Sequence, residues 1–376
     1  MIPRMKNKVI ISLCIAVIGL SGCARKDAQS SDADESNMRN IKMGTLQLDS
    51  IPVDYFEASM DSYLCMERDT IFLFDKKFSW VMRFSKDGKL VDKVLHKGQG
   101  PKEINMDIQD YCFADSSLYI LDSGLGITRY TSNYERKERL QIDCDRNREE
   151  VSYENPLRYS TSDLAPILKS AGNYFYRNAV AYQGMIEDFL SDTKKYFQNV
   201  HILLKINKKT GKMERVIGNY PPFYEQKHAA FMEVYYDIDP QNQFYVSFEM
   251  DSSIYCYDAN FELLYTFGGQ GKNMTAYDKS YSMETLLQER MNIRNKYSYY
   301  HHLKYLPELD MLFRSYTRPN DEKQDGLQIY QGKTLIADVS VPKKMYVLGY
   351  SAPYVYVTSG LDEMSESFAL YRFEIK

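Results

Sequence analysis

The sequence is poor in the residues from which most catalytic and metal sites are built. Its 376 residues include five histidines, six cysteines and one tryptophan. It has no Gly-x-Ser-x-Gly elbow, no His-Glu-x-x-His motif, no zinc-type pair and no calcium-loop spacing. His301 and His302 are adjacent, but neighbours in a strand point to opposite faces and cannot easily share a metal. We therefore assign no catalytic, cofactor-binding or metal-ligating residue.

Long apolar stretches are also scarce. One uncharged apolar run, Val9 to Leu20, follows Arg4, Lys6 and Lys8, and no second membrane segment is visible. Crossing a bilayer as a helix takes about 20 apolar residues, so this run is too short for a permanent span. A basic end followed by a short apolar core is typical of a signal peptide. We expect residues 1–22 to direct export and then to be removed.

The four residues that end this segment are Leu20-Ser21-Gly22-Cys23. They resemble the lipobox of bacterial lipoproteins, which implies cleavage before Cys23 and attachment of diacylglycerol to its thiol. An ordinary signal peptide with an incidental cysteine is the alternative. On the lipoprotein interpretation the acyl chains anchor the protein to a membrane of the cell envelope. The expected location is the outer membrane, on its periplasmic or its outer surface.

Residues 24–40 contain no aromatic or β-branched residue, so we expect residues 23–40 to be a lipidated cysteine followed by a flexible tether. Acidic residues occur early in this segment, at Asp27, Asp32, Asp34 and Glu35. They resemble the surface-export signals of lipoproteins from Bacteroides-type bacteria. The lysine-plus-acid cluster usual in those signals is reduced here to Lys26-Asp27. The sequence therefore does not decide whether the protein is displayed on the cell surface.

The charge balance argues against nucleic acid as a partner. The chain has 47 basic and 51 acidic residues, and removing residues 1–22 takes away three basic residues and no acidic one. The mature chain then has 44 basic against 51 acidic residues, a net charge near -7. Binding a polyanion requires a concentrated basic face, which this balance does not provide.

The cysteines do not form a framework that would hold a small fold together. Cys14 leaves with the signal peptide and Cys23 is the lipid attachment site, which leaves Cys65, Cys112, Cys144 and Cys256. An exported compartment permits disulfides, yet these four lie far apart in a chain long enough to bury a core. We expect buried free thiols, although their disulfide state is not fixed by spacing.

What the sequence does contain, from residue 41 onward, is a repeated pattern. Aromatic and β-branched strands alternate with polar turns, and several copies include a tight turn with Asn or Gly before a strand that ends at glycine. Period-two patterning with such turns predicts antiparallel hairpins. Six copies are recognisable, over residues 71–95, 118–142, 202–217, 244–267, 311–333 and 354–373.

Six such units have the size of propeller blades with insertions, and a sandwich is the alternative. The segment 41–51, with Met43, Leu46, Leu48 and Ile51, predicts a strand outside the first unit, while the chain ends inside a strand at 373–375. We therefore predict an all-β fold over residues 41–376. It is a six-bladed β-propeller with helical insertions, whose ring is closed by an N-terminal strand.

The loop His96–Ile104 contains Gly98-Gln99-Gly100-Pro101-Lys102-Glu103. It resembles the Gly-x-Gly-Pro-x-Glu loop between blades of NHL-like six-bladed β-propeller lipoproteins from Bacteroides-type bacteria. Residues 218–223 and 268–271 repeat it weakly. The resemblance implies architecture only, since most members have no established activity. A glycine-rich phosphate loop needs a helix N-terminus behind it, whereas this loop leads into another strand.

Two segments interrupt the repeat and are predicted to be helical. They form either a lid over one mouth of the central channel or ordinary packing against a blade. In the first, Asp163 caps a helix to Leu168, and Met185, Phe189 and Leu190 form an apolar face before Lys194-Lys195. The second runs from Ser282, a possible N-cap, to Lys296, with Met283, Leu286, Leu287 and Met291 at helical spacing.

Aromatic residues are abundant, with 33 Tyr and 18 Phe, and many lie within the predicted strands, where packing between blades explains them. Those expected to be freer to contact a ligand are Tyr220, Phe223, Tyr224, Tyr297, Tyr299 and Tyr300. We predict a non-catalytic binding or scaffold propeller for a glycan, peptide or protein partner. The alternative is a calcium-dependent propeller hydrolase or lactonase, with inward Asp, Asn and Glu residues in the central channel.

The substitution Cys23→Ser is expected to abolish membrane attachment, because a thiol is needed to accept the diacylglycerol. The measurement is cell fractionation after metabolic labelling with a fatty acid. A variant that still carries the label and sediments with membranes would show that Cys23 is not the anchor.

Overall fold

The computed structural model divides the chain into two units, residues 1–37 and 38–376. The predicted signal peptide, the lipid attachment site Cys23 and the tether all lie outside the described residues. The structure describes residues 46–53, 57–59, 61–142, 152–154, 158–159, 168–180, 188–189, 191–226, 231–277, 279, 281, 283–362 and 367–375.

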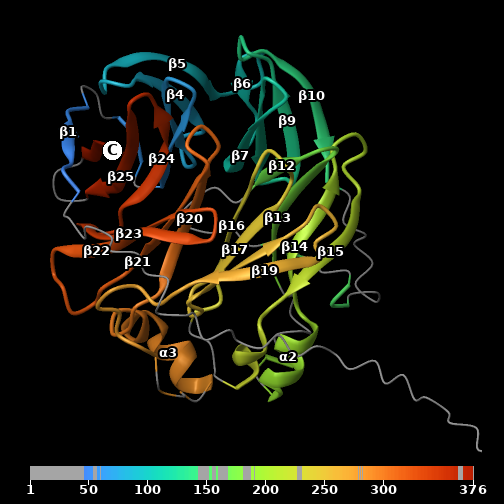
Figure 1. Cartoon of the computed structure of the whole chain (residues 1–376). Helices are drawn as coiled ribbons and strands as arrows, with labels where there is room; N and C mark the ends of the chain where they lie inside the picture. Colours follow the sequence, from blue (N-terminus) through green and yellow to red (C-terminus); the bar gives the residue numbers. More distant parts are fainter. Residues whose placement is uncertain are drawn as a thin grey trace, which may run out of the picture. The chain divides into compact units, whose positions relative to one another are not determined.

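The described chain forms six separate sheets, which are the blades of a six-bladed β-propeller (Figure 1). Their pairings are antiparallel except for a short parallel pair in the first blade, between residues 96–97 and 103–104. The predicted fold class is confirmed. Blade 1 contains β2 (Ser62–Glu67), β3 (Thr70–Asp75), β4 (Trp80–Ser85) and β5 (Leu90–Lys97), with the short β6 (Glu103–Ile104). Blade 2 contains β7 (Ile108–Ala114), β8 (Ser117–Asp122), β9 (Gly126–Tyr130) and β10 (Arg136–Gln141). Blade 3 contains β11 (Arg158–Tyr159), β12 (Lys169–Ala171), β13 (Tyr174–Val180), β14 (His201–Asn207) and β15 (Met213–Asn219).

The remaining three blades have the same antiparallel order. Blade 4 contains β16 (Val234–Ile238), β17 (Phe244–Phe248), β18 (Ser253–Tyr257) and β19 (Leu263–Gly268). Blade 5 contains β20 (Tyr300–Leu306), β21 (Met311–Tyr316), β22 (Gln324–Gln331) and β23 (Thr334–Pro342). Blade 6 contains β24 (Tyr346–Ser351), β25 (Tyr354–Asp362), β26 (Ser367–Glu374) and the N-terminal β1 (Asp49–Ile51).

The first strand of each blade was missed or weakly marked in the sequence repeat. Around the axis of the ring, each of the strands β7, β12, β16, β20, β24 and β2 contacts the next one in this order. They carry buried polar residues such as Asp110, Asp237 and His301. Such residues interrupt the apolar pattern by which strands are recognised, so the clearest copies of the repeat show three strands where the blades have four. The third copy also misses β13.

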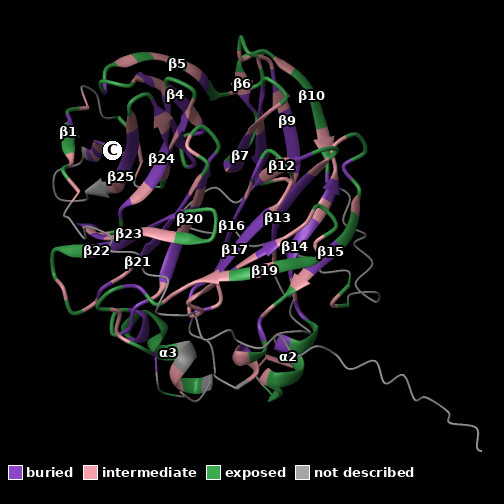
Figure 2. Cartoon of the chain, viewed as in Figure 1, coloured by how far each residue is buried: buried purple, intermediate pink, exposed green. Residues whose placement is uncertain are grey.

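Burial falls from the middle of each blade to its outer edge (Figure 2). Every residue of β17 is buried, whereas no residue of the outer strand β19 is. Both faces of each sheet pack against neighbouring blades, and aromatic rings fill these contacts. Phe74 of blade 1 stacks on Tyr111 of blade 2 with ring centroids 3.6 Å apart. Contacts of this kind also join Tyr176 of blade 3 to Phe244 of blade 4, and Tyr245 of blade 4 to Tyr305 of blade 5.

The glycine-rich loop after β5 joins blade 1 to blade 2 and is followed by a strand, as predicted. The Glu103 carboxylate accepts a hydrogen bond from the Gly100 backbone N–H at 2.6 Å and lies 3.0 Å from His96 Nε2. These bonds lower the pKa of Glu103, the backbone bond most. At Gly98, an added Cβ would lie 2.1 Å from this carboxylate. Glycine and glutamate therefore shape an inter-blade turn.

Both described helices lie on the same face of the ring, which we call the helix face (Figure 1). Helix α2 (Thr193–Asn199) lies in the connection from β13 to β14, and α3 (Met283–Arg294) lies in the connection from β19 to β20. The connections between second and third strands and between blades share this face, because the strands alternate in direction. The turns that join first and second strands form the opposite face, the turn face.

The two predicted insertions are helical in part. Asp192 caps α2 by accepting a hydrogen bond from the Lys195 N–H at 3.0 Å, and Phe189 packs on Tyr196. Of the helix predicted from the cap Asp163 to Leu168, residues 163–167 lie outside the described residues, and Leu168 directly precedes strand β12 instead of ending a helix. Met185, Leu190 and the N-cap Ser282 also lie outside the described residues, and α3 covers 283–294. No helix in the described part of the chain has the length and apolarity needed to cross a membrane.

The N-terminal strand β1 lies in the sheet of blade 6, antiparallel to β26, with Ile51 opposite Leu370. Ile51 is buried, and Leu46 and Leu48 pack against the core between blades 5 and 6. The predicted strand covered residues 41–51, whereas the observed one covers three residues, and residues 41–45 lie outside the described part.

Deleting residues 41–51 is expected to destabilise the fold far more than deleting residues 24–39. The first deletion removes Leu46, Leu48 and Ile51 and leaves β26 with an unpaired edge, and a buried side chain of this size contributes about 1.5–3 kcal/mol. The second removes a segment with little to bury. Thermal midpoints measure the difference, and equal midpoints would contradict closure by this strand.

Candidate functional site

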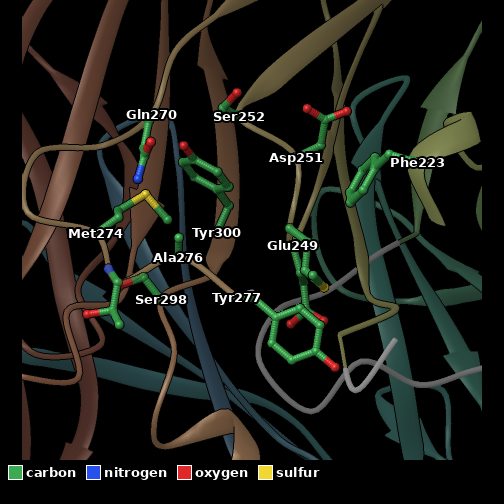
Figure 3. A pocket seen from close by; sticks show the side chains of 12 residues that line it. Phe223, Glu249, Asp251, Ser252, Gln270, Met274, Ala276, Tyr277, Ser298 and Tyr300 are labelled. Atoms are coloured by element: carbon green, nitrogen blue, oxygen red, sulfur yellow. The ribbon is translucent and has the colours of Figure 1, made fainter. Parts of the chain in front are cut away.

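A pocket of about 270 Å³ opens on the helix face (Figure 3). It is lined from segments 249–252 and 270–277, together with Ser298, Tyr300 and Phe223. The first segment joins β17 to β18, and the second belongs to the connection from blade 4 to blade 5. Phe223 comes from the 3-10 helix η3 (Pro222–Gln226), which precedes blade 4. We call this hollow the helix-face pocket.

A buried ion pair forms the floor of the helix-face pocket. Glu249 is completely buried, and its two carboxylate oxygens accept hydrogen bonds from Arg294 of α3 at 2.5 and 3.0 Å. The Glu233 backbone N–H donates a third bond at 3.0 Å. Burial alone would lower the pKa of Arg294, but Glu249 raises it above its ordinary value. The pair therefore fixes α3 against the end of β17.

A second buried guanidinium holds the rim of the pocket in place. Arg314 of β21 is completely buried and donates hydrogen bonds to the carbonyls of Ser252 at 2.8 Å and Gly269 at 3.0 Å. Its guanidinium lies 3.7 Å from the ring centroid of Tyr300. The Tyr300 hydroxyl accepts a bond from the Gly271 N–H and donates one to the Gly269 carbonyl. Both lining segments are thus tied to the blades.

The groups that the pocket offers to a ligand are mostly uncharged. Phe223 is half-buried and stands on the side opposite Gln270 and Met274, with Asp251 and Ser252 between them (Figure 3). The Asp251 carboxylate already accepts bonds from the Tyr255 hydroxyl at 2.6 Å and the Ser253 N–H at 2.8 Å. An aromatic ring beside hydroxyl, amide and carboxylate groups suits a polyhydroxylated ligand such as a sugar.

The structure corrects the expectation that six aromatic residues are free to contact a ligand. Tyr224, Tyr297 and Tyr300 are buried, and Tyr300 begins β20 instead of lying outside a strand. The Tyr220 hydroxyl is bonded to the Met232 carbonyl at 2.6 Å, and Tyr299 lies under Arg294. Of the six, the pocket includes Phe223 and Tyr300.

Of the other lining residues, Gln270 lies in segment 268–271, which weakly repeats the inter-blade loop, and no pattern in the sequence indicated a ligand site there or at the rest. Asp251, Ser252 and Gln270 lie in connections with the composition of ordinary turns, and Tyr277 lies outside the repeat. The spacing between strands located these connections. It did not indicate that segments 249–252 and 270–277 meet around one hollow.

The axis of the ring carries charges of both signs. Asp237 of β16 lies 3.0 Å from the Lys169 ammonium of β12 and 3.9 Å from that of Lys304 of β20. We call these three residues the axial cluster. Burial would raise the pKa of Asp237, but the two lysines lower it. The cluster connects blades 3, 4 and 5 around one carboxylate.

The calcium-dependent alternative requires several carboxylates that are free of cations. Within the described ranges, no group of three or more His, Cys, Asp or Glu residues is placed to hold a metal ion. The axial carboxylates are paired instead with bases, Asp237 with the two lysines and Asp110 with Arg177 at 3.7 Å. The described residues at the axis therefore do not form the group of cation-free carboxylates that a calcium site would require.

The two adjacent histidines lie on β20 and serve packing. His302 Nε2 lies 3.2 Å from the Val347 carbonyl, and the His301 ring lies beside that of Tyr299. Burial lowers the pKa of His301 to about 4 and that of His302 to about 3, so both are neutral at pH 7.

The thiols of Cys65, Cys112 and Cys256 are free. Burial raises the pKa of Cys65 and of Cys112 to about 12, which makes them poor nucleophiles. Cys144 lies outside the described residues.

The substitution Arg294→Met is expected to lower the free energy of unfolding by about 3–5 kcal/mol, because Glu249 would remain buried without its cation. Amide hydrogen exchange in α3 should also become faster. Arg290→Met on the same helix is the control. Arg290 lies 3.7 Å from the carboxylate of Glu233, and both side chains are partly exposed to solvent. Equal losses in the two variants, measured by denaturant unfolding, would contradict the role given to the buried pair.

No protein-family model matches the sequence, and no curated protein matches it. Solved structures are similar in fold. A member of the DUF4221 family from Bacteroides vulgatus aligns with a TM-score of 0.61 and 13% identity, over 88% of this chain and 97% of that chain. A protein from Bacteroides fragilis that is inferred to be exported aligns with a TM-score of 0.52 and 12% identity, over 88% and 95%. At such identities, the likeness establishes the propeller fold.

Proposed function

We propose that this chain is an exported, membrane-anchored lipoprotein whose propeller is a non-catalytic binding module for a glycan. The signal-peptide pattern and Cys23 support export and anchoring. The inferred export of the similar Bacteroides fragilis protein is in line with this. The NHL-like character of the propeller belongs to the same proposal, since it rests on the loop Gly98–Glu103. The outer membrane is the proposed location.

The observation that carries the binding proposal is the composition of the helix-face pocket. One half-buried ring, Phe223, faces uncharged hydrogen-bonding groups across a hollow of about 270 Å³. This volume lies just below the range of drug-sized ligand sites, which suits one or two sugar units. Sugars bind by stacking a ring face on an aromatic side chain while their hydroxyls bond to amides and carboxylates.

The buried charges behind the pocket favour binding without rearrangement. Arg294 and Arg314 hold the floor and the rim through hydrogen bonds to blades and connections, including those to Glu249, Ser252 and Gly269. A preformed site avoids the cost of ordering loops when the ligand arrives. A peptide or protein partner would need a broader surface than this pocket alone.

The hydrolase alternative finds less support in the same contacts. Glu249 accepts bonds from a bidentate arginine and a backbone N–H, so its oxygens are occupied and unsuited to acid–base exchange. Asp251 is bonded to Tyr255 and Ser253. At the axis, lysines stand beside the carboxylate that a calcium ion would need.

A glycan array probed with the purified protein is expected to identify a ligand, and Phe223→Ala should weaken its binding about tenfold, or about 1.4 kcal/mol. The matched control is Phe78→Ala, because Phe78 is an exposed ring that packs on Trp80 away from the pocket. Absence of any glycan ligand, or an equal loss in the control, would contradict the proposal.

The same protein should show no turnover of ester, lactone or glycoside substrates, with or without calcium. A thermal midpoint that rises at micromolar calcium together with measurable turnover would favour the hydrolase over the binding module.

A further inference from the structure

A second hollow lies at the end of the central channel on the turn face, opposite the helix-face pocket. Its volume is about 220 Å³, and the first strands of five blades contribute to it, including Glu67, Phe113, Lys169, Asp237 and Lys304. We call it the channel mouth. Glu67 and Ile238, the last residues of β2 and β16, line this hollow. The hollow therefore lies beside the turns that follow these two strands.

A groove of about 290 Å³ runs outward from the channel mouth between blades 1 and 2. Glu67 and Phe113 line both hollows, so the two share a wall. Half-buried Phe113 packs on Phe72 with ring centroids 4.8 Å apart, and half-buried Tyr134 lies near the outer end. The rim carries hydroxyl groups, from Thr70, Ser116 and Ser132 among others.

The hydrogen-bonding capacity of the axial cluster is not fully used. Asp237 accepts bonds from the backbone N–H groups of Tyr305 at 2.9 Å and Ile238 at 3.1 Å, and Lys169 lies 3.0 Å away. Lys304 Nζ is 3.9 Å from Asp237, which is too long for a hydrogen bond. In the part of the chain that the structure describes, Asp237 is the one ion-pair partner of Lys304.

The two ammonium groups therefore share one carboxylate and retain donors that line the channel mouth. An ammonium has three donors, of which Lys169 uses one on Asp237. About a quarter of each lysine side chain is exposed. Burial raises the pKa of Glu67 in the same wall, although Lys304 opposes this, so Glu67 holds its negative charge less readily than usual.

We propose that the channel mouth binds the carboxylate of an acidic sugar, with Lys304 and Lys169 as donors, and that the adjoining sugar units lie along the groove over Phe113 toward Tyr134. A carboxylate supplies the acceptors that the two ammonium groups lack. The hydroxyls of the rim and the aromatic floor suit the sugar ring. This site is separate from the helix-face pocket and does not depend on it.

The test is calorimetric titration of the purified protein with a galacturonic acid disaccharide and with the uncharged galactose disaccharide. The acidic sugar is expected to bind at least tenfold more tightly, and its affinity should fall as salt rises. This comparison uses the unaltered protein and is independent of any variant. Equal binding of the two sugars, or no binding of either, would overturn the proposal.

Variants locate the site. Lys304→Met should lower the affinity for the acidic disaccharide at least tenfold, whereas Lys97→Met, which removes an exposed lysine paired with Asp107, should not change it. Tyr134→Ala should weaken the disaccharide more than the single galacturonate, and its effect remains informative if Lys304→Met fails to fold. Equal losses for Lys304→Met and Lys97→Met would overturn the assignment.

Two further measurements distinguish the channel mouth from the helix-face pocket and from a peptide-binding site. Phe223→Ala should leave binding of the acidic disaccharide unchanged. The proposal for the helix-face pocket and the proposal for the channel mouth can therefore be contradicted independently. A tripeptide with a free C-terminal carboxylate should bind weakly or not at all. Binding of the tripeptide in place of the acidic sugar would contradict the sugar as the ligand.

Discussion

The packing of each sheet between two neighbours is the constraint on which the structure depends. A blade exposes two apolar faces, and it can bury both when the ring is complete. The stacked pair Phe74 and Tyr111 belongs to one such contact, and the core around Phe313 and Phe373 belongs to another. In the described part of the chain, the apolar cores span pairs of neighbouring blades, so the blades are expected to form and to lose their structure together.

The same packing determines where polar groups can lie. A polar side chain near the axis or under a connection is cut off from water and must find a partner inside the protein. Asp237 finds two lysines, Glu249 finds Arg294, and Arg314 finds backbone carbonyls. These contacts join elements from different blades and fix the connections that surround both hollows. Because the contacts join different blades, we expect both hollows to keep their shape as long as the ring is closed.

The strands that could be predicted from the sequence are those with a regular pattern of apolar residues. The middle strands, for example β3 and β17, are buried on both faces and stand out as aromatic and β-branched runs. The inner strands were missed because Asp237 and its polar counterparts interrupt that pattern. The helix-face pocket was not predictable, because its residues come from connections whose meeting depends on the whole ring. Tyr224 was misassigned because position outside a strand does not imply exposure.

The glycan site that we propose on the helix face is preformed and should bind its ligand without rearrangement. A crystal structure of the protein with a glycan selected on the array tests this most directly. We expect a sugar ring against Phe223, with the backbone of segments 249–252 and 270–277 displaced by less than about 1 Å from its unbound position. A ligand bound elsewhere on the propeller, or a pocket that forms only after these segments move, would contradict it.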